Sequence, residues 1–120
     1  MKILVIDDEP LICEEFRDIL EEEGHEVDVA KNGKEALQKV QGKEYELVFL
    51  DVLMPRMEGR EVFEAIKKIS KVSVAIMSGY LPPNKEREVL DLGAVACFRK
   101  PLELDRVHSL INSIKLQKSN

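Results

Sequence analysis

The sequence has no tryptophan, and aromatic residues make up only 5% of its 120 residues. It has two cysteines, Cys13 and Cys97, and neither has a companion histidine at the spacing of a metal site. A disulfide framework or a cysteine-based metal site is therefore not indicated. We expect both cysteines to be reduced thiols within the core.

No apolar run is long enough for a signal peptide or a membrane-spanning helix. We therefore expect a cytoplasmic protein that does not contact the membrane. The net charge of -5 repels phosphate backbones and anionic lipids. Direct binding to nucleic acid is not expected.

The sequence alternates short apolar runs with segments of helical periodicity. Hydrophobic residues make up 44% of the chain, which is enough for one core, and no internal boundary divides it. We expect a single domain over residues 1–120. Strands are predicted at 2–6, 25–30, 47–51, 72–77 and 95–99. Five strands, each followed by a helix, predict an α/β fold with a three-layer, doubly wound (βα)5 arrangement and a parallel sheet.

Several local features of the helices follow from their sequence. Asn32-Gly33 is predicted to form a turn, and Asn84 is predicted to cap the fourth helix. Leu90 and Leu92 in the fourth helix, and Leu104 in the last, are expected to belong to the apolar stripes that face the sheet.

Reactive side chains gather where the predicted strands end. Asp7 and Asp8 follow the first strand, Asp51 ends the third, Ser78 follows the fourth and Lys100 follows the fifth. In a doubly wound sheet, ligands bind beyond the carboxyl ends of the strands, where the strand order reverses. If the first and third strands are neighbours there, three carboxylates, a hydroxyl and an ammonium converge.

Three close carboxylates repel one another and require a positive partner. A hard divalent cation such as Mg²⁺ suits carboxylate ligands, and Lys100 supplies a fixed positive charge. Neither a P-loop nor a GxGxxG motif is present, so a bound phosphate would be small or covalently held. We infer that Asp51 is a nucleophile toward phosphorus. Mg²⁺ and Lys100 would neutralise the phosphoryl oxygens, and Ser78 would donate a hydrogen bond to one of them.

Each motif also has a plain structural interpretation. Asp7-Asp8-Glu9 before Pro10 could be an acidic helix start, favoured by the helix dipole. Lys100-Pro101 could be only a turn, and Ser78 only a loop hydroxyl. Their joint placement at the strand ends of one rim favours a functional site.

Taken together, the motifs resemble the receiver domain of two-component response regulators, as in chemotaxis receivers. The resemblance rests on Asp7-Asp8, Asp51 with Met54-Pro55 and Gly59, Ser78-Gly79 and Lys100-Pro101, in this order and spacing. It extends from Lys2 to the last helix. It implies a flavodoxin-like sheet with strand order 2-1-3-4-5.

The resemblance implies that Asp51 accepts a phosphoryl group from a sensor histidine kinase, with Mg²⁺ or Mn²⁺ as cofactor. Asp8 would ligate the cation directly and Asp7 mainly through water. Asp51 and the main-chain carbonyl of Leu53 would complete the protein ligands. Such a domain catalyses only its own phosphorylation and dephosphorylation and is not otherwise an enzyme.

The resemblance also implies how the signal leaves the site. Ser78 and Phe98 would form a switch pair, and the Lys100–Pro101 peptide bond is expected to be cis. On phosphorylation, Ser78 would move toward the phosphoryl group and Phe98 would turn inward. The face made by the fourth helix, fifth strand and last helix would then change its affinity for a downstream protein.

Two alternatives remain from the sequence. One is a receiver that docks partners independently of phosphorylation, although every motif residue is retained. The other is a Mg²⁺-dependent phosphatase of the aspartate-nucleophile type. Those enzymes resemble a different pattern, with the nucleophile on the first strand and a second aspartate two residues on. Here Asp7 is followed by Asp8-Glu9, and no cap domain is evident.

Overall fold

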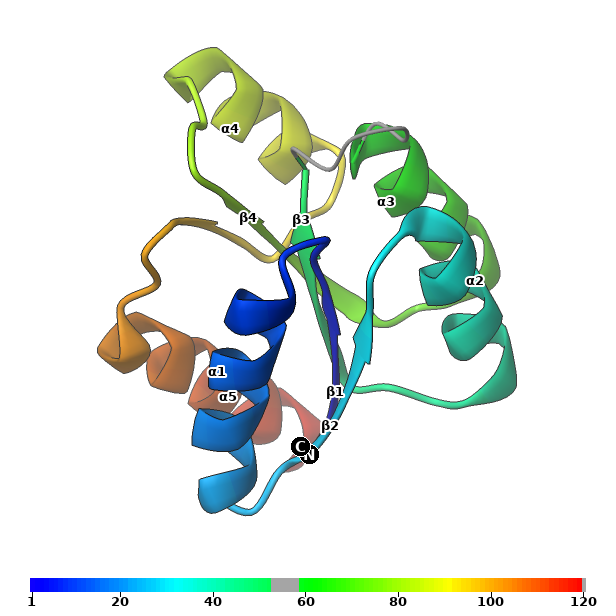
Figure 1. Ribbon diagram of the computed structural model, residues 1–120. Coiled ribbons are helices and arrows are strands. Elements are labelled where there is room, and N and C mark those ends of the chain that lie inside the picture. The colour runs from blue at the N-terminus through cyan, green and yellow to red at the C-terminus, as the bar shows by residue number, and fades with distance from the viewer. Residues whose placement is uncertain (53–58, 120) are drawn as a thin grey trace.

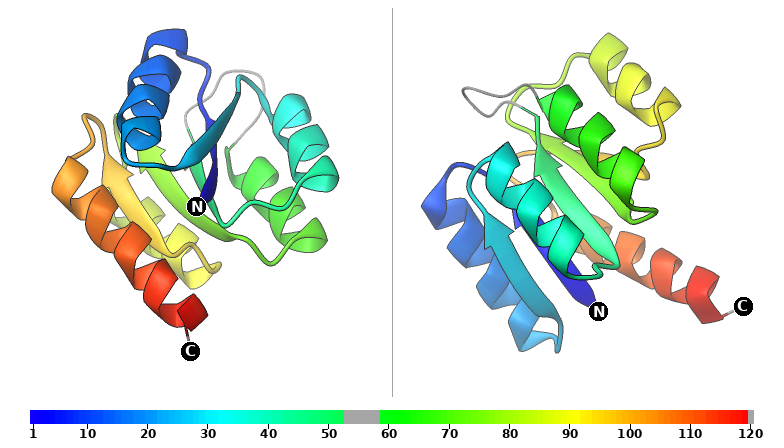
Figure 2. Two further views of the ribbon diagram at one scale, coloured as in Figure 1. Left: turned by 90° about the horizontal axis from the view of Figure 1, so that it is seen from below. Right: turned by 90° about the vertical axis from the view of Figure 1, so that its right-hand side faces the viewer.

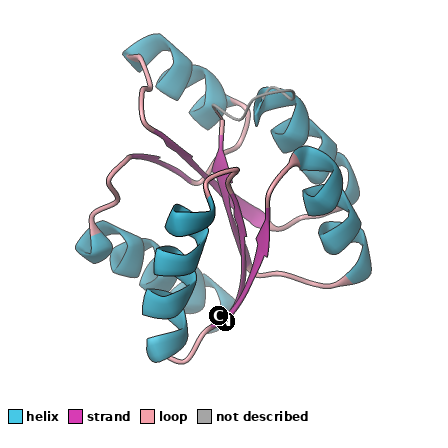
Figure 3. Ribbon diagram, viewed as in Figure 1, coloured by secondary structure: helices cyan, strands magenta, loops and turns pink. Residues whose placement is uncertain are grey.

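The computed structural model describes residues 1–52 and 59–119, in which five strands alternate with five helices (Figures 1 and 3). The strands are β1 (Lys2–Ile6), β2 (Glu26–Ala30), β3 (Leu47–Asp51), β4 (Ser73–Ser78) and β5 (Ala96–Arg99). The helices are α1 (Pro10–Glu22), α2 (Gly33–Gly42), α3 (Gly59–Ile69), α4 (Pro83–Asp91) and α5 (Leu104–Ser119). The strands pair in parallel in the order β2-β1-β3-β4-β5, so the predicted fold is confirmed.

Helices cover both faces of the sheet and create three layers (Figure 2). Alternate residues of β1 divide between these layers, as the period of a strand requires. Ile3 and Val5 pack with α1 and α5, whereas Leu4 and Ile6 pack with α2, α3 and α4. In the described part of the chain, no helix is long and apolar enough to span a membrane.

The central strand β3 places a carboxylate at the carboxyl-terminal end of the sheet. All five of its residues are buried, because β1 and β4 flank it and helices cover both faces. Its last residue, Asp51, lies opposite Met77 of β4. The strand order reverses between β1 and β3, and Asp51 therefore lies at the position where such sheets bind ligands.

Two helix starts differ from the sequence prediction. Asn32 is the N-cap of α2, and its Oδ1 accepts a hydrogen bond of 2.8 Å from the Glu35 N–H. Gly33 is therefore the first helical residue and not part of a free turn. Asn84 does not cap α4, because the helix already begins at Pro83. The fixed φ of proline suits the first helical position and places Asn84 inside the helix.

Three leucines expected in apolar stripes are partly exposed. Leu90, Leu92 and Leu104 are 41%, 38% and 42% exposed, respectively. In α4 the side chain that reaches the core is Val89. The prediction was wrong because Leu92 follows the last residue of α4, Asp91, and Leu104 is the first residue of α5, where the helix has not yet reached the core.

Gly59 begins α3 in close contact with the residue after Asp51. A Cβ at this position would overlap the Cα and side chain of Val52. Only a residue without a side chain permits this approach. The start of α3 is thereby fixed against the carboxyl end of β3.

Both cysteines are free thiols, as expected. Cys13 is buried and Cys97 is half-buried. Burial raises the pKa of each thiol to about 11, so both are protonated near neutral pH.

Candidate functional site

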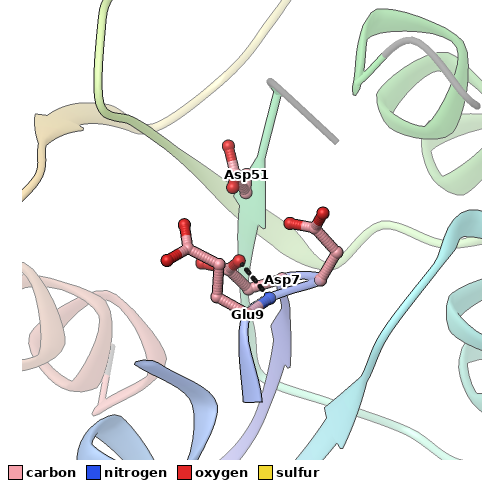
Figure 4. Close-up of side chains that lie close together, drawn as sticks. Asp7, Glu9 and Asp51 are labelled. Atoms are coloured by element: carbon pink, nitrogen blue, oxygen red, sulfur yellow. Dashed lines mark hydrogen bonds between the residues drawn. The ribbon is translucent and has the colours of Figure 1, made fainter. Parts of the chain in front are cut away.

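Four carboxylates meet where β1 and β3 end (Figure 4). Asp7, Asp8, Glu9 and Asp51 each offer an oxygen atom, and these atoms lie within 4.8 Å of one another. Asp7 and Asp51 are buried, Asp8 is half-buried and Glu9 is exposed. The structure therefore brings together the three carboxylates predicted from the sequence and adds a fourth.

Lys100 is the cation that three of these carboxylates share. Its Nζ lies 2.7 Å from Asp7 Oδ2, 2.8 Å from Asp51 Oδ2 and 3.4 Å from Glu9 Oε1. The Lys100 N–H donates a hydrogen bond of 2.8 Å to the carbonyl oxygen of Ser78. The Lys100–Pro101 peptide bond is cis.

Asp7 is held by the backbone on both sides. Its N–H donates to the carbonyl oxygen of Ala30 at 3.0 Å, which extends the pairing of β1 with β2. Its Oδ1 accepts a hydrogen bond of 3.0 Å from the Glu9 N–H (Figure 4). These bonds orient the carboxylate toward Lys100 and Asp51.

The electrostatics of the cluster are unbalanced. Burial raises the pKa of Asp7, and the nearby Asp51 charge adds to this, although Lys100 and the Glu9 N–H oppose both effects. Burial alone would lower the pKa of Lys100, but its bonds to Asp51 and Asp7 raise it above the ordinary value. One ammonium thus faces four carboxylates. Crowded carboxylate oxygens with this negative excess form a donor set that fits a hard divalent cation.

The Ser78 hydroxyl lies at the end of β4, beside the strand that carries Asp51. It is buried, and its Oγ donates to the Tyr80 carbonyl oxygen at 2.7 Å. The Tyr80 N–H donates back to Oγ at 3.1 Å. The hydroxyl is thus held by the loop that follows β4, and a bond to any other group would require it to leave Tyr80.

Phe98 does not lie on the same face of the sheet as Ser78. It is 4% exposed and packs with Phe49 in the layer of α1 and α5, with ring centroids 6.1 Å apart. Ser78 pairs with Arg99, and Ile76 pairs with Cys97, so Cys97 is the inward β5 residue on the Ser78 face. Ser78 and Phe98, the switch pair predicted from the sequence, therefore point to opposite faces of the sheet in this structure, because side chains of adjacent strand residues alternate between faces.

Cys97 connects that face to α4. Its side chain packs against the core formed with α2, α3 and α4. Its Sγ lies 3.9 Å from the Glu86 carbonyl oxygen of α4. A movement of the Cys97 side chain would therefore change its contact with the α4 backbone.

Some of the expected site lies outside the described residues. This holds for the Leu53 carbonyl and for Met54-Pro55. Glu9, by contrast, is a residue that the sequence reasoning missed, since it was considered only as part of an acidic helix start. The available signal was its place directly after Asp7-Asp8, within reach of the same strand end.

Comparison with known proteins gives consistent results. The family model of the response regulator receiver domain matches residues 3–112. Sporulation initiation phosphotransferase F of Bacillus subtilis is 32% identical over 120 residues, which cover 99% of this chain and 97% of that protein. A CpxR homolog from Haemophilus influenzae, named as a transcriptional regulatory protein, is 40% identical over 100 residues, which cover 83% of this chain.

The chain spans about half the length of some relatives. The match covers 44% of the Haemophilus influenzae protein and 48% of response regulator RR06 from Streptococcus pneumoniae.

Solved structures have the same architecture. A two-component response regulator from Clostridium difficile has a TM-score of 0.92 and 27% identity, and the match covers 100% of this chain and 98% of that one. Response regulator TrrA from Thermotoga maritima, solved with Mg²⁺ and BeF, has a TM-score of 0.83 and 34% identity, with 94% and 97% covered. The chain belongs to the family of receiver domains of two-component response regulators, which are phosphorylated on an aspartate.

Proposed function

We propose that Asp51 is the phosphorylated aspartate and that its phosphodonor is the phosphohistidine of a sensor histidine kinase. The observation that carries this proposal is the position of Asp51. Its carboxylate ends the central strand, 2.8 Å from the Lys100 ammonium and beside the carboxylates of Asp7 and Asp8. It is the one carboxylate of the cluster contributed by β3, at the point where the strand order reverses.

The chemistry assigned to these residues is nucleophilic substitution at phosphorus. A carboxylate oxygen of Asp51 attacks the phosphorus atom, the nitrogen–phosphorus bond of the phosphohistidine breaks, and an acyl phosphate forms on Asp51. Lys100 pairs with a phosphoryl oxygen, since its ammonium already lies beside the nucleophile. Ser78 leaves the Tyr80 carbonyl and donates its hydroxyl hydrogen to another phosphoryl oxygen.

Mg²⁺ or Mn²⁺ is the proposed cofactor. When bound, such an ion neutralises the phosphoryl oxygens as charge develops. We assign Asp8 and Asp51 as direct ligands and Asp7 as a ligand mainly through water, with the Leu53 carbonyl completing the set. The support is the group of four carboxylates within 4.8 Å, whose negative excess exceeds what Lys100 balances.

The proposed output passes through Ser78 and Cys97 to α4. When Ser78 turns toward the phosphoryl group, space opens on its face of the sheet, where Cys97 contacts the α4 backbone. The face made by α4, β5 and α5 then changes its affinity for a downstream protein. A full reversal of the two states requires roughly 5 kcal/mol from the phosphoryl contacts.

The proposed biological setting follows from the same site. Residues 1–120 act as one receiver domain that catalyses only its own phosphorylation and dephosphorylation. The partners are a kinase and a protein target, and the net charge of -5 opposes direct contact with nucleic acid or anionic membranes. Two free thiols fit the reducing cytoplasm.

Intact mass after incubation with acetyl phosphate tests the proposal. The wild-type chain should gain one phosphoryl group with Mg²⁺ and none with EDTA. Asp51→Ala should gain none, whereas the control Asp18→Ala, which removes an exposed carboxylate of α1, should behave as wild type. Absence of the adduct in wild type would favour a docking module that works without phosphorylation.

A further inference from the structure

Glu9 is the outermost carboxylate of the acidic cluster and differs from its buried partners. Its side chain is 59% exposed, compared with 0% for Asp7 and 4% for Asp51. Glu9 is the N-cap residue of α1, yet its side chain makes no capping hydrogen bond. An N-cap side chain commonly accepts a bond from the first helical turn. Here the carboxylate instead reaches Lys100, with Oε1 3.4 Å from Nζ.

The positive charge of Lys100 would lose carboxylate partners once a divalent cation binds. Its Nζ lies within 2.8 Å of oxygens of both Asp7 and Asp51. The cation would compete for these same carboxylates, and it would repel the ammonium at short range. Glu9 is the third carboxylate in contact with Lys100, and the helix start does not fix its side chain. It can therefore stay with the ammonium while the two aspartates turn toward the cation.

We propose that Glu9 is a positioning residue that holds the Lys100 ammonium while Asp7 and Asp51 turn toward a divalent cation, and thereby strengthens cation binding. Glu9 acts through Lys100 and is not itself a ligand. The inference rests on the proposed function, since it assumes that the cluster binds Mg²⁺.

Calorimetric titration of the full chain with Mg²⁺ tests the role of Glu9 without a phosphorylation readout. Glu15→Gln is a matched control, because Glu15 is also exposed, lies on α1 and lines a groove between α1 and α5 that Glu9 and Lys100 also line. Both Glu9→Gln and Glu15→Gln remove one negative charge. Because a partly exposed ion pair is weak, we expect about a threefold larger Kd for Glu9→Gln and no comparable change for Glu15→Gln. An equal increase in Kd for both variants would overturn the inference, since the loss of one negative charge near the site would then explain both.

The same titrations in a Lys100→Gln background test the route of the effect. Without the ammonium, Glu9→Gln should weaken Mg²⁺ binding no more than Glu15→Gln does. A threefold loss that persists would overturn the inference, because Glu9 would then act on the cation directly. Wild-type protein that fails to bind Mg²⁺ would refute the proposed cofactor as well. If wild-type protein binds Mg²⁺ and the Kd is the same for Glu9→Gln and Glu15→Gln, only the role of Glu9 is refuted.

Discussion

The Lys100 ammonium lies 2.8 Å from an Asp51 carboxylate oxygen, although 49 positions separate the two residues in the chain. The contact exists because β5 and β3 end at the same edge of the sheet, on either side of β4. Asp7 shares the same ammonium from β1. The site therefore depends on one lysine to stabilise two buried carboxylates in the absence of a metal ion.

Lys100→Gln should destabilise the metal-free protein by about 3 kcal/mol, because it leaves buried carboxylates without their partner. Mg²⁺ should then raise the melting temperature of the variant more than that of wild type, since the cation no longer competes with the ammonium. Thermal unfolding with EDTA and with Mg²⁺ measures both effects. Lys43→Gln is the control, because Lys43 pairs with Asp28 away from the cluster and its loss should not respond to Mg²⁺. An equal Mg²⁺ response in wild type and Lys100→Gln would contradict this prediction.

Asp7→Asn should stabilise the metal-free protein at neutral pH by about 1 kcal/mol, because it removes a buried charge beside Asp51 and leaves Lys100 paired with Asp51 and Glu9. Burial raises the pKa of Asp7 above its ordinary value of 3.8. The folded state therefore binds a proton at Asp7 more tightly than the unfolded chain does. The stability contributed by this group is therefore lost as pH rises from 3.8 through the folded pKa. Urea denaturation at pH 7 and near pH 3.8 should show a smaller gain at the lower pH. A variant less stable than wild type at pH 7 would refute the argument, and Asp18→Asn is the exposed control.

Substitutions at Phe98 and Cys97 should have different effects, one on the free energy of unfolding and the other on the response of α4 to phosphorylation. Phe98→Leu removes part of a buried ring and should lower the free energy of unfolding by about 1–2 kcal/mol, with little change in the response to phosphorylation. Cys97→Ala should cost less stability but weaken the difference in amide hydrogen exchange of α4 between the free and phosphorylated states. If Phe98→Leu abolished the α4 difference and Cys97→Ala preserved it, the assignment to Cys97 would be wrong.

The helix cap at Asn32 should be measurable on its own. Asn32→Ala removes the bond to the Glu35 N–H and should lower the free energy of unfolding by about 1 kcal/mol. Asn84→Ala is a matched control, since Asn84 lies exposed inside α4 and alanine favours helices. Denaturant titrations of the two variants compare the positions. A larger loss at Asn84 than at Asn32 would contradict the observed helix starts.

The sheet and the three aspartates were predictable because apolar runs and strand ends are local features. Four consecutive apolar residues before Asp51 are typical of a strand covered on both faces. The strand order that brings Asp7 and Asp8 beside Asp51 came from the family resemblance. Gly59 could also be identified as part of the motif from the sequence. The structure was needed to show why a glycine is required there, namely its contact with the Val52 backbone.

Features that depend on register were not predictable. Phe98 was assigned to the switch pair because it is aromatic, whereas a shift of one position in a strand reverses the face that a side chain occupies. The start of α4 was missed because Asn84 and Pro83 both suit helix starts. Glu9 was missed because an acidic residue before a helix is commonly part of the helix start, and its contact with Lys100 is visible only in the structure.

The most direct test of the central claim is to identify the residue that carries the phosphoryl group. Borohydride reduces an acyl phosphate to an alcohol, so phosphorylated Asp51 would become homoserine, which peptide mass spectrometry can locate. After treatment with acetyl phosphate and Mg²⁺, the account predicts homoserine at position 51 and unmodified Asp7 and Asp8. Homoserine at position 7 or 8, with position 51 unchanged, would contradict it.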